Sequence, residues 1–492
     1  MARLSNMTGN LSSPPATGSR TRWWIVGIVV AVVACLIGTG IFAFDAGRST
    51  NGSVPTFQRE DWQPPPQVVL ASTMRERPMP GWRATGTDLG LPDTTIFAES
   101  DRNPGSTTPF VGSVNNNAYF LASSPGSPDR QQWLVGLDVD TGERLFHPVK
   151  IDAGQNFLKC FLNGPETVLC LADDVQDGNA EGMAWVVDAK SGDIMFNGPS
   201  QLHATPVSNI AVQQVGIYAV AEVRDKGVYG VGPHAETTWF VPGATKVKPA
   251  KWPADFAPPA LAVAQNSVMS SNRVVIFSLI DGKVITPHIS GEGNPLTAVV
   301  YPGGLAVEAA TDTNSSIPDT VVFLDDAGNY ISETNSSGDL TLLSMTLPML
   351  KSSPSYTIFG GNGADLLELP GAGLGPDSVL IGHRVYVPES NWEGPVKVRR
   401  WRQFDLTTGG EGNTCRSNMS HYVANDGHVG VFETGRNDAV GATSFAMDLA
   451  TCEKLWTIPV NPDSFHRLWH ISGDLVELSD DGTELHSLVA SE

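Results

Sequence analysis

The segments GLDVDTGERLF at residues 136–146 and VVDAKSGDIMF at residues 186–196 contain the pattern that decides the fold. In both, an apolar strand leads to an Asp, two further residues, a Thr or Ser, a Gly, and a second strand with an aromatic residue. Variants occur at 404–412 and 447–456, and weaker copies at 277–285, 323–331 and 477–485. The first two copies are 50 residues apart, and Asp405 and Asp448 are 43 apart. These intervals are typical of four-stranded propeller blades.

Each copy predicts a turn between the third and fourth strands of a blade. The Asp side chain accepts hydrogen bonds from backbone amides of the turn, and the Thr or Ser adds another. Gly supplies a positive φ, and the following aromatic residue fills space between neighbouring blades. The residues that we assign to this structural role are Asp138, Gly142, Asp188, Gly192, Asp405, Asp448 and Trp456.

Short apolar runs separated by Gly, Asp, Asn and Pro continue from Trp82 to the end of the chain. Each has the length and the Val, Ile and aromatic content of a strand, so the domain is predicted to be all-β. Residues 465–490 form only a partial blade, and residues 81–85 are expected to add its outer strand and close the ring. Since residues 340–370 are poorly patterned, we predict eight blades, with seven as the alternative. The expected blades are 110–150, 155–199, 205–243, 258–289, 296–334, 340–370, 377–417 and 420–460.

The pattern resembles the repeat of quinoprotein-type (PQQ-like) β-propellers, Ala-x-Asp-x-x-Thr-Gly-x-x-x-Trp. The first two copies match its Asp, Thr or Ser, Gly and aromatic positions. In the copy at 447–456, Cys452 replaces the Gly, which suits a disulfide at that turn. The resemblance extends over residues 82–490 at low density. It implies a propeller fold but no particular activity.

The quinone-dependent enzymes of this type bind their cofactor on the propeller axis, with calcium ligands, a stacking Trp and usually adjacent cysteines. This sequence has no Cys-Cys pair and no recognisable ligand set, so we predict no cofactor. No nucleophile motif or metalloprotease motif occurs either, and we assign no catalytic residue.

Three groups of residues carry side chains that can bind metals, and each also suits a structural role. Asp138 and Asp140 lack the further ligands of a calcium loop. The acidic cluster Asp173, Asp174 and Asp177 suits a solvated loop, with a weak calcium site as the alternative. His466 and His470 lie in an expected strand, where residues four apart are separated by about 13 Å. We therefore assign no metal ligand.

Four cysteines besides Cys35 predict two disulfides. Cys160 and Cys170 flank the turn signal Asn163-Gly164-Pro165-Glu166 symmetrically, so they face each other if the flanking strands form a hairpin. By elimination, Cys415 pairs with Cys452. Free buried thiols are the alternative. An even number of cysteines agrees with an exported domain.

The N-terminal region predicts a membrane anchor. Residues 23–44 contain 22 uncharged residues after Arg20 and Arg22, enough to span a bilayer with the N-terminus cytoplasmic. A cleaved signal peptide or a lipoprotein lipidated at Cys35 are the alternatives. The predicted organisation is a cytoplasmic tail at 1–22, a transmembrane helix at 23–44, a Pro-rich stalk at 45–81 and the propeller at 82–492.

The net charge of the chain is −21. Residues 1–44 carry three Arg and no acid, which leaves −24 on the remainder. This charge repels phosphate backbones, so nucleic-acid binding is not expected. Our hypothesis is a non-catalytic binding or scaffold protein of the bacterial cell envelope, with an envelope protein or polymer as its partner. The alternative is an envelope enzyme, either a degenerate quinoprotein dehydrogenase or a glycan hydrolase or lyase.

Overall fold

Nine antiparallel four-stranded sheets follow one another in the computed structural model. The chain divides into two units, residues 1–53 and 54–492, and all the sheets belong to the second. The structure describes residues 57–491 apart from these segments: 98–108, 125–129, 155, 174–181, 206–209, 224–225, 244–245, 250–251, 266–273, 290–292, 313–314, 316, 337, 344–345, 353, 371–377, 394–395, 434–442 and 460–466.

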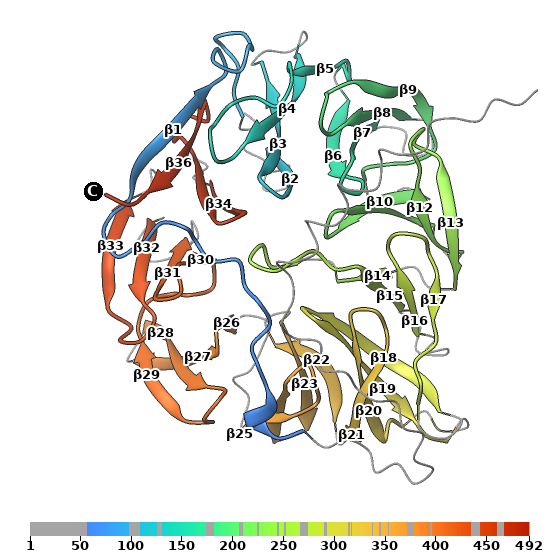
Figure 1. The fold of residues 1–492 in the computed structure, drawn as a ribbon, viewed down its shortest axis with the longest axis vertical. Coiled ribbons are helices and arrows are strands. Elements are labelled where there is room, and N and C mark those ends of the chain that lie inside the picture. The colour runs from blue at the N-terminus through green and yellow to red at the C-terminus, as the bar shows by residue number, and fades with distance from the viewer. Residues whose placement is uncertain are drawn as a thin grey trace, which may run out of the picture. The chain divides into compact units, whose positions relative to one another are not determined.

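Within the second unit, the sheets are arranged around a common centre as blades of a propeller, with the first strand of each blade innermost (Figure 1). Blades 1 to 3 consist of β2 (Phe110–Val114), β3 (Asn117–Ser123), β4 (Gln132–Asp138), β5 (Val149–Ile151), β6 (Phe157–Leu162), β7 (Thr167–Asp173), β8 (Gly182–Asp188), β9 (Ile194–Ser200), β10 (Ile210–Val215), β11 (Tyr218–Val223), β12 (Gly227–Val231) and β13 (Thr237–Pro242).

Blades 4 to 6 consist of β14 (Lys246–Lys248), β15 (Leu261–Gln265), β16 (Val274–Ser278), β17 (Val284–Ile285), β18 (Asn294–Tyr301), β19 (Gly304–Ala310), β20 (Thr320–Asp325), β21 (Tyr330–Asn335), β22 (Asp339–Leu343), β23 (Leu347–Ser352), β24 (Ser355–Phe359) and β25 (Asp365–Pro370). Blades 7 to 9 consist of β26 (Val379–Ile381), β27 (Arg384–Glu393), β28 (Val396–Asp405), β29 (Glu411–Cys415), β30 (Tyr422–Asn425), β31 (Val429–Glu433), β32 (Thr443–Asp448), β33 (Lys454–Pro459), β34 (Arg467–Ile471), β35 (Asp474–Leu478), β36 (Glu484–Val489) and β1 (Met79–Thr85).

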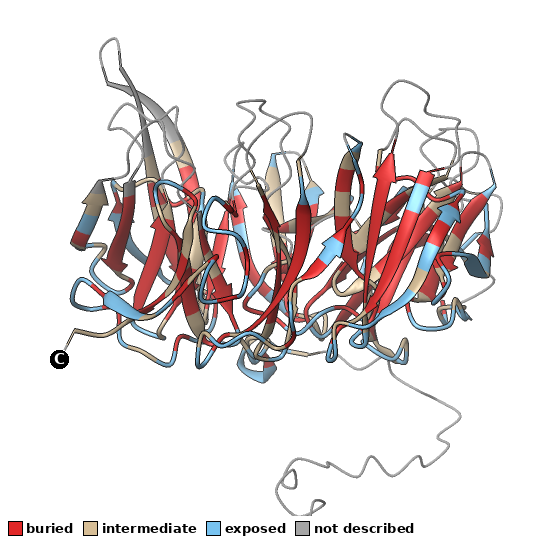
Figure 2. Cartoon of the chain, turned by 90° about the horizontal axis from the view of Figure 1, so that it is seen from above, coloured by how far each residue is buried: buried red, intermediate tan, exposed pale blue. Residues whose placement is uncertain are grey.

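The hydrophobic core lies between successive blades. One cluster joins Leu134 of blade 1 to Val168 and Trp185 of blade 2, and comparable clusters lie between other blades. Each sheet therefore has two covered faces, which explains why β4 is a nearly continuous buried run rather than an alternating one. Buried residues run through the sheets, and exposed residues are concentrated at their ends (Figure 2).

Both ends of the second unit contribute to blade 9. Strand β1 pairs with β36, and Ala84 lies opposite Leu485. The side chain of Arg83 bonds to Glu484 across this pair. Residues 81–85 thus close the ring as the sequence predicts, and closure leaves the innermost and outermost strands as the sheet edges.

The predictions of eight or seven blades are wrong, because nine sheets are present. One source of the error is residues 340–370, which were named as a blade but doubted because of their poor patterning, and which form the complete blade β22–β25. Its last turn contains Gly360, Gly361 and Gly363 instead of the Asp-x-x-Thr-Gly signal. The blade formed by residues 465–490 and completed by β1, as expected, is the ninth and was not among the eight expected blades.

The predicted membrane topology requires a correction as well. In the part of the chain that the structure describes, no helix is long and apolar enough to cross a membrane. The helix identified there is the 3-10 helix η1 (Arg59–Asp61). Residues 1–22, the predicted span 23–44 and Cys35 lie outside the described residues. The single-pass membrane location and the transmembrane part of the fold class are therefore withdrawn.

Residues 57–78, here called the strap, belong to the predicted Pro-rich stalk but pack on the ring. In each blade, the turn between the first and second strands and the turn between the third and fourth strands lie on the same face of the ring, here called the turn face. The strap lies on this turn face (Figure 1). Backbone hydrogen bonds fix the strap at its centre: the amides of Val68, Leu70 and Ala71 donate to carbonyl oxygens of Asp255, Asn425 and Gly473 at 2.7–2.8 Å.

Candidate binding site

The predicted turn residues lie in third-to-fourth-strand turns. The Asp138 carboxylate accepts bonds from the Thr141 amide at 3.0 Å and hydroxyl at 2.9 Å. Asp188 accepts from the Ser191 amide at 2.7 Å, and this bond lowers the pKa of Asp188. Asp448 accepts the same two bonds from Thr451, and Asp405 accepts bonds from the amide and hydroxyl of Thr407, one position earlier in its turn.

These turns are also the points where neighbouring blades touch. Gly142 has φ 73°, and a Cβ there would lie 2.6 Å from Cδ2 of Trp82, on the preceding blade. Gly192 has φ 74°, and its Cβ would lie 2.5 Å from Cδ2 of Phe146. Glycine is thus needed both for the backbone conformation and for the ring that covers it. We call this arrangement the inter-blade contact.

Two inter-blade contacts are built differently. Between blades 7 and 8, Cys452 takes the glycine position with φ 62° and forms a disulfide with Cys415 at the end of β29. Between blades 6 and 7, the strap supplies the cover: the Arg59 guanidinium lies over Gly409 and donates to the Thr408 carbonyl oxygen at 3.1 Å. The strap therefore completes a contact that blade 6 does not make itself.

The second predicted disulfide, Cys160–Cys170, also forms, with the two residues directly opposite each other on β6 and β7. Trp456 is buried, and its indole N–H donates to the Met74 carbonyl oxygen of the strap at 2.8 Å. The ring of this residue thus helps to hold the strap on blade 8.

A central polar cluster consists of Gln67, Asp255, Tyr422 and Asn425. It joins the strap to the loop between β14 and β15 and to β30, near the centre of the ring (Figure 1). The Asp255 Oδ2 atom accepts from Gln67 Nε2 at 3.0 Å and from the Tyr422 hydroxyl at 3.2 Å. Asp255 is 2 % exposed, and burial raises its pKa to about 6.

The central polar cluster could not be recognised from the sequence. Gln67 and Asp255 are 188 residues apart in the sequence. The Gln67 side chain also bonds to the backbone amide of Gly382 and the backbone carbonyl oxygen of Leu380, and no side-chain pattern indicates such contacts. One sequence feature could have indicated that the strap docks on the ring: Trp62, a large apolar residue beside the prolines of the strap. It is 3 % exposed and packs in the core between blades 6 and 7.

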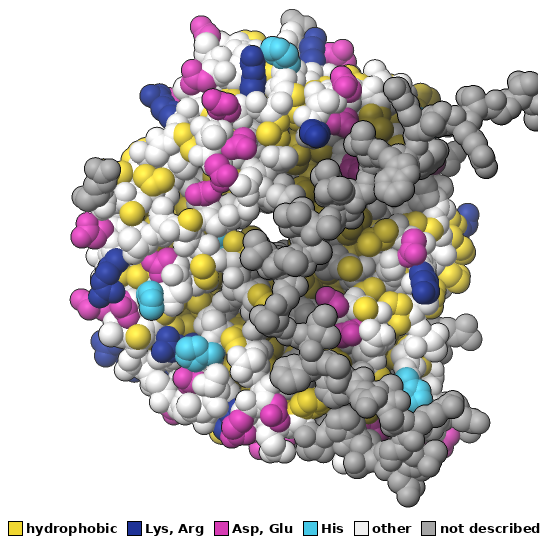
Figure 3. Space-filling view, in the orientation of Figure 1, with side chains coloured by type: hydrophobic (Ala, Val, Ile, Leu, Met, Phe, Trp, Pro, Cys, Tyr) yellow, Lys and Arg dark blue, Asp and Glu magenta, His cyan; other side chains and the backbone are white. Residues whose placement is uncertain are grey.

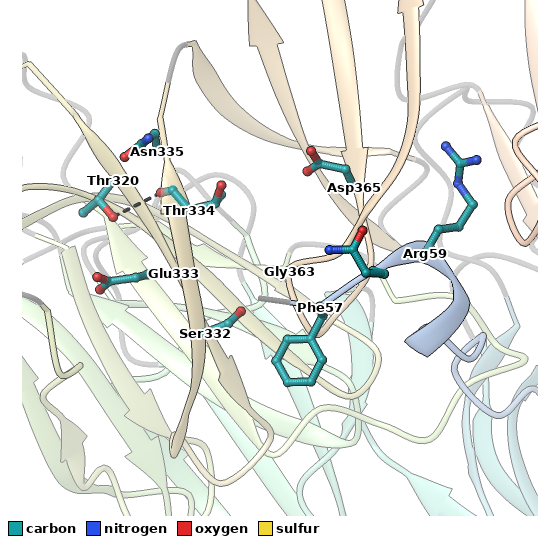
Figure 4. Close-up of a pocket in the computed structure, with 10 residues that line it drawn as sticks. Phe57, Arg59, Thr320, Ser332, Glu333, Thr334, Asn335, Gly363 and Asp365 are labelled. Carbon is teal, nitrogen blue, oxygen red and sulfur yellow. Dashed lines mark hydrogen bonds between the residues drawn. The ribbon is translucent and has the colours of Figure 1, made fainter. Parts of the chain in front are cut away.

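A cleft of about 410 Å³ lies between blades 5 and 6 at the edge of the strap (Figure 4). One wall consists of residues 332–335 of β21 and Thr320 of β20, and the opposite wall consists of Gly363 and Asp365. Residues 57–59 of the strap complete it. The lining is mostly polar: the Thr320 hydroxyl donates to the Thr334 carbonyl oxygen at 3.1 Å, and the Ser332 hydroxyl to that of Asn362 at 2.6 Å.

The charged residues that line the cleft are Glu333, Asp365 and Arg59. The Glu333 side chain points away from Asp365, on the face of β21 opposite to Ser332, and Arg59 lies beyond Asp365 (Figure 4). Partial burial, reinforced by the nearby charge of Glu368, raises the pKa of Asp365, and Arg59 opposes this shift. Asp and Glu side chains, interspersed with Lys and Arg, are distributed around the visible part of the turn face (Figure 3).

The remaining candidates from the sequence do not assemble into a site. Asp173 is buried and accepts the Ala204 and Thr205 amides at 2.8 and 2.9 Å, which ties blade 2 to the start of blade 3. Burial lowers the pKa of His470 to about 4. Asp174, Asp177 and His466 lie outside the described residues. Where the structure describes the chain, no group of three or more His, Cys, Asp or Glu residues could hold a metal ion.

A family model described as the conjugation-associated 9-bladed beta-propeller domain matches residues 54–491. A protein of Mycolicibacterium smegmatis (strain MKD8), described as uncharacterized, is 54% identical over 469 residues, which cover 95% of this chain and 96% of the relative. Among solved structures, BamB from Moraxella catarrhalis is 10% identical with a TM-score of 0.33, covering 84% of this chain and all of its own. The designed Ika8 protein is 12% identical with a TM-score of 0.35, covering 69% and 98%.

Proposed function

Because the chain belongs to the family of conjugation-associated nine-bladed β-propeller domains, we propose that it serves a conjugation apparatus as a protein-binding platform. The family match over residues 54–491 is the observation that carries this proposal. The likeness to quinoprotein-type repeats is kept only at the level of the propeller fold, since the matching family is a different one.

The structure of the second unit supports a platform rather than a moving device. Nine sheets share their cores with their neighbours, and a disulfide and the strap reinforce individual inter-blade contacts. A closed ring of this kind presents turns and loops in fixed positions, which is what a binding surface requires.

The expected partner is a protein and not the transferred DNA. Residues 45–492 carry a net charge of −24, and a phosphate backbone would be repelled by it. A protein partner with basic residues would instead be attracted over a distance of about a Debye length, roughly 10 Å at moderate salt.

The proposal is tested by deleting the gene in a conjugating strain that carries it and measuring the frequency of DNA transfer. We expect transfer to fall and the wild-type chain to restore it, while growth is unchanged. A photo-crosslinker at exposed Asn335 should link a component of the apparatus, whereas one at Asp152 should not. Unchanged transfer in the deletion strain would refute the proposal.

A further inference from the structure

We propose that the outer rim of blades 2 to 4 is a contact surface through which two copies of this chain associate. In the part of the chain that the structure describes, five large hydrophobic side chains are exposed along this rim. They are Ile194, Met195, Phe240, Ile280 and Val284, with exposed fractions between 45% and 65%, and we call them the apolar rim. The inference goes beyond the proposed function and does not depend on it.

The apolar rim lies on consecutive outermost elements of the ring. Ile194 and Met195 are on β9 and Phe240 is on β13, the last strands of blades 2 and 3. Val284 is on β17, the last strand of blade 4, and Ile280 is in the turn before it. Hydrophobic side chains gather at the outer edge of the molecule over β13 (Figure 3). The described residues of the other six outermost strands include a single exposed large hydrophobic residue, on β1, so these side chains are concentrated in one sector.

Aromatic packing holds the centre of the apolar rim in place. The Phe240 ring stacks on the Tyr229 ring of β12, with the ring centroids 4.5 Å apart. Trp239 lies over Gly282 of blade 4, and its ring centroid is 5.7 Å from that of Phe277. An exposed aromatic side chain that is already held loses little conformational entropy when a partner covers it. Phe240 is therefore suited to be the central anchor of an interface.

The apolar rim exposes enough hydrophobic surface for a weak interface. At roughly 200 Å² for a large side chain, the exposed fractions correspond to apolar surface on the order of 500 Å². Exposed apolar surface of this extent is typical of interaction sites. Two copies would bury on the order of 1,000 Å², which is near the lower limit for a specific interface. The expected dissociation constant is therefore about 10 μM, so that monomers predominate at submicromolar concentrations.

The charge of this sector favours a second copy over a basic partner. Residues 194–285 contain seven Lys or Arg and five Asp or Glu, a net charge of +2, which leaves −23 on the rest of the chain. A basic protein would be attracted to the acidic rest of the chain. Two copies of so acidic a chain repel each other except where the local charge is small. The apolar rim lies in that sector, so identical copies can approach each other there.

The rim is also compatible with two-fold symmetry. β13 is the last strand of its sheet, so its outer edge has no neighbouring strand in that sheet. A two-fold axis perpendicular to this edge brings the same strand of a second copy alongside it in antiparallel orientation, and the two edges can then pair. Because both copies contribute the same residues, this one surface is sufficient for a closed dimer.

Sedimentation velocity of the full-length chain at concentrations between about 0.5 and 100 μM measures the association. We expect a monomer at the lowest concentration and mostly dimer at the highest. Raising the salt concentration from about 50 to about 500 mM should tighten the dimer, because salt screens the repulsion between two acidic copies. An interface held by charge pairs would respond in the opposite direction, and that response would contradict the inference.

Substitutions in the apolar rim locate the interface. Met195→Asp and Ile280→Asp each place a carboxylate in the contact, and each should weaken the dimer at least about tenfold. Ile317→Asp is the matched control, because Ile317 is 75% exposed but lies between β19 and β20 of blade 5. This variant should dimerise as the wild type does. Since all three positions are exposed, circular dichroism should show that the variants are folded.

A photo-crosslinker gives the location independently. Placed at exposed Thr238 of β13, it should yield covalent dimers of this chain, whereas one at exposed Asp152 should not. A wild-type chain that stayed monomeric at about 100 μM would overturn the inference and leave the apolar rim to a different protein. Wild-type dimerisation by both rim variants, or an equal loss in Ile317→Asp, would also overturn it. The frequency of DNA transfer in the deletion strain tests only the proposed function, so the two can fail separately.

Discussion

At the scale of single residues, the buried carboxyl group of Asp255 links the stability of the second unit to pH. Its folded pKa is about 6, above its ordinary value of 3.8, so the folded state binds the proton more tightly than the unfolded state. The stabilisation is full below about pH 4 and is lost as the pH rises through 6. Above pH 7 the charged group costs on the order of 3 kcal/mol.

Asp255→Asn should remove this pH dependence. The amide oxygen of asparagine can accept the bonds from Gln67 and Tyr422 without a charge. In urea unfolding, the variant should exceed the wild type in stability at pH 7.5 by up to about 3 kcal/mol, and the difference should vanish near pH 4. Asp152→Asn, at an exposed position, should stay within about 0.5 kcal/mol of the wild type. A constant difference across this pH range would contradict the prediction.

Some of the residues that stabilise the fold can be recognised from the sequence, and others cannot. The turn residues around Asp138 and Asp188 carry a short local pattern, because the hydrogen bonds of these Asp side chains lie within three residues. Cys160 and Cys170 were found for the same reason, through the turn that they flank. Asp255 meets Gln67 at a separation of 188 residues, and a single sequence has no local signal for such a contact.

At the scale of elements, the two disulfides constrain different parts of the propeller. Cys160–Cys170 joins adjacent strands of blade 2 at a separation of 10, whereas Cys415–Cys452 joins blades 7 and 8 at a separation of 37. Chain-entropy estimates give about 3 kcal/mol for the shorter loop and about 4 kcal/mol for the longer. The Cys415–Cys452 disulfide also takes the place of the aromatic ring in the inter-blade contact between blades 7 and 8.

Replacing Cys415 and Cys452 by serine should therefore cost more than the same change at Cys160 and Cys170. We expect a difference of about 1 kcal/mol in unfolding free energy. Hydrogen exchange should increase in β29 and in the turn after β32 of the first variant, but not in blades 1 to 4. Equal exchange in both variants would show that the inter-blade disulfide has no local role.

Element by element, most blades were predicted, including the one at 205–243 that lacks an Asp-x-x-Thr-Gly turn, whereas the blade at 340–370 was doubted. Residues 340–370 were doubted because Gly360, Gly361 and Gly363 form their turn without the Asp signal. The strap was taken for a free stalk because its prolines exclude helix and central strand. Its docking depends on backbone bonds and on one buried tryptophan, Trp62, and proline content says nothing of either.

At the scale of the whole second unit, closure by β1 predicts a sharp dependence on the N-terminal boundary. A chain that begins at residue 57 retains the strap and β1, and we expect it to keep the stability of the propeller. A chain that begins at residue 86 lacks both, which exposes the edge of β36 and uncovers Trp456. Exposed edges pair with other chains, so the shorter chain should dimerise or aggregate.

Size-exclusion chromatography and thermal unfolding of the two truncated chains provide the measurement. The first should elute as the parent unit does and melt at the same temperature. The second should elute earlier and melt at least about 5 °C lower. Identical behaviour of the two chains would mean that β1 and the strap contribute nothing to closure.

Blade 9 combines the first strand of the propeller with its last three, and this affects folding during synthesis on the ribosome. Strand β1 emerges at the start of the propeller, but its partner β36 is translated after every other strand. At about 5–20 residues per second, the early strand waits roughly 20 to 80 seconds before its partner strand is made. Messages cut short anywhere before β36 would yield chains that stay open, and cellular proteases could recognise them by that unpaired strand.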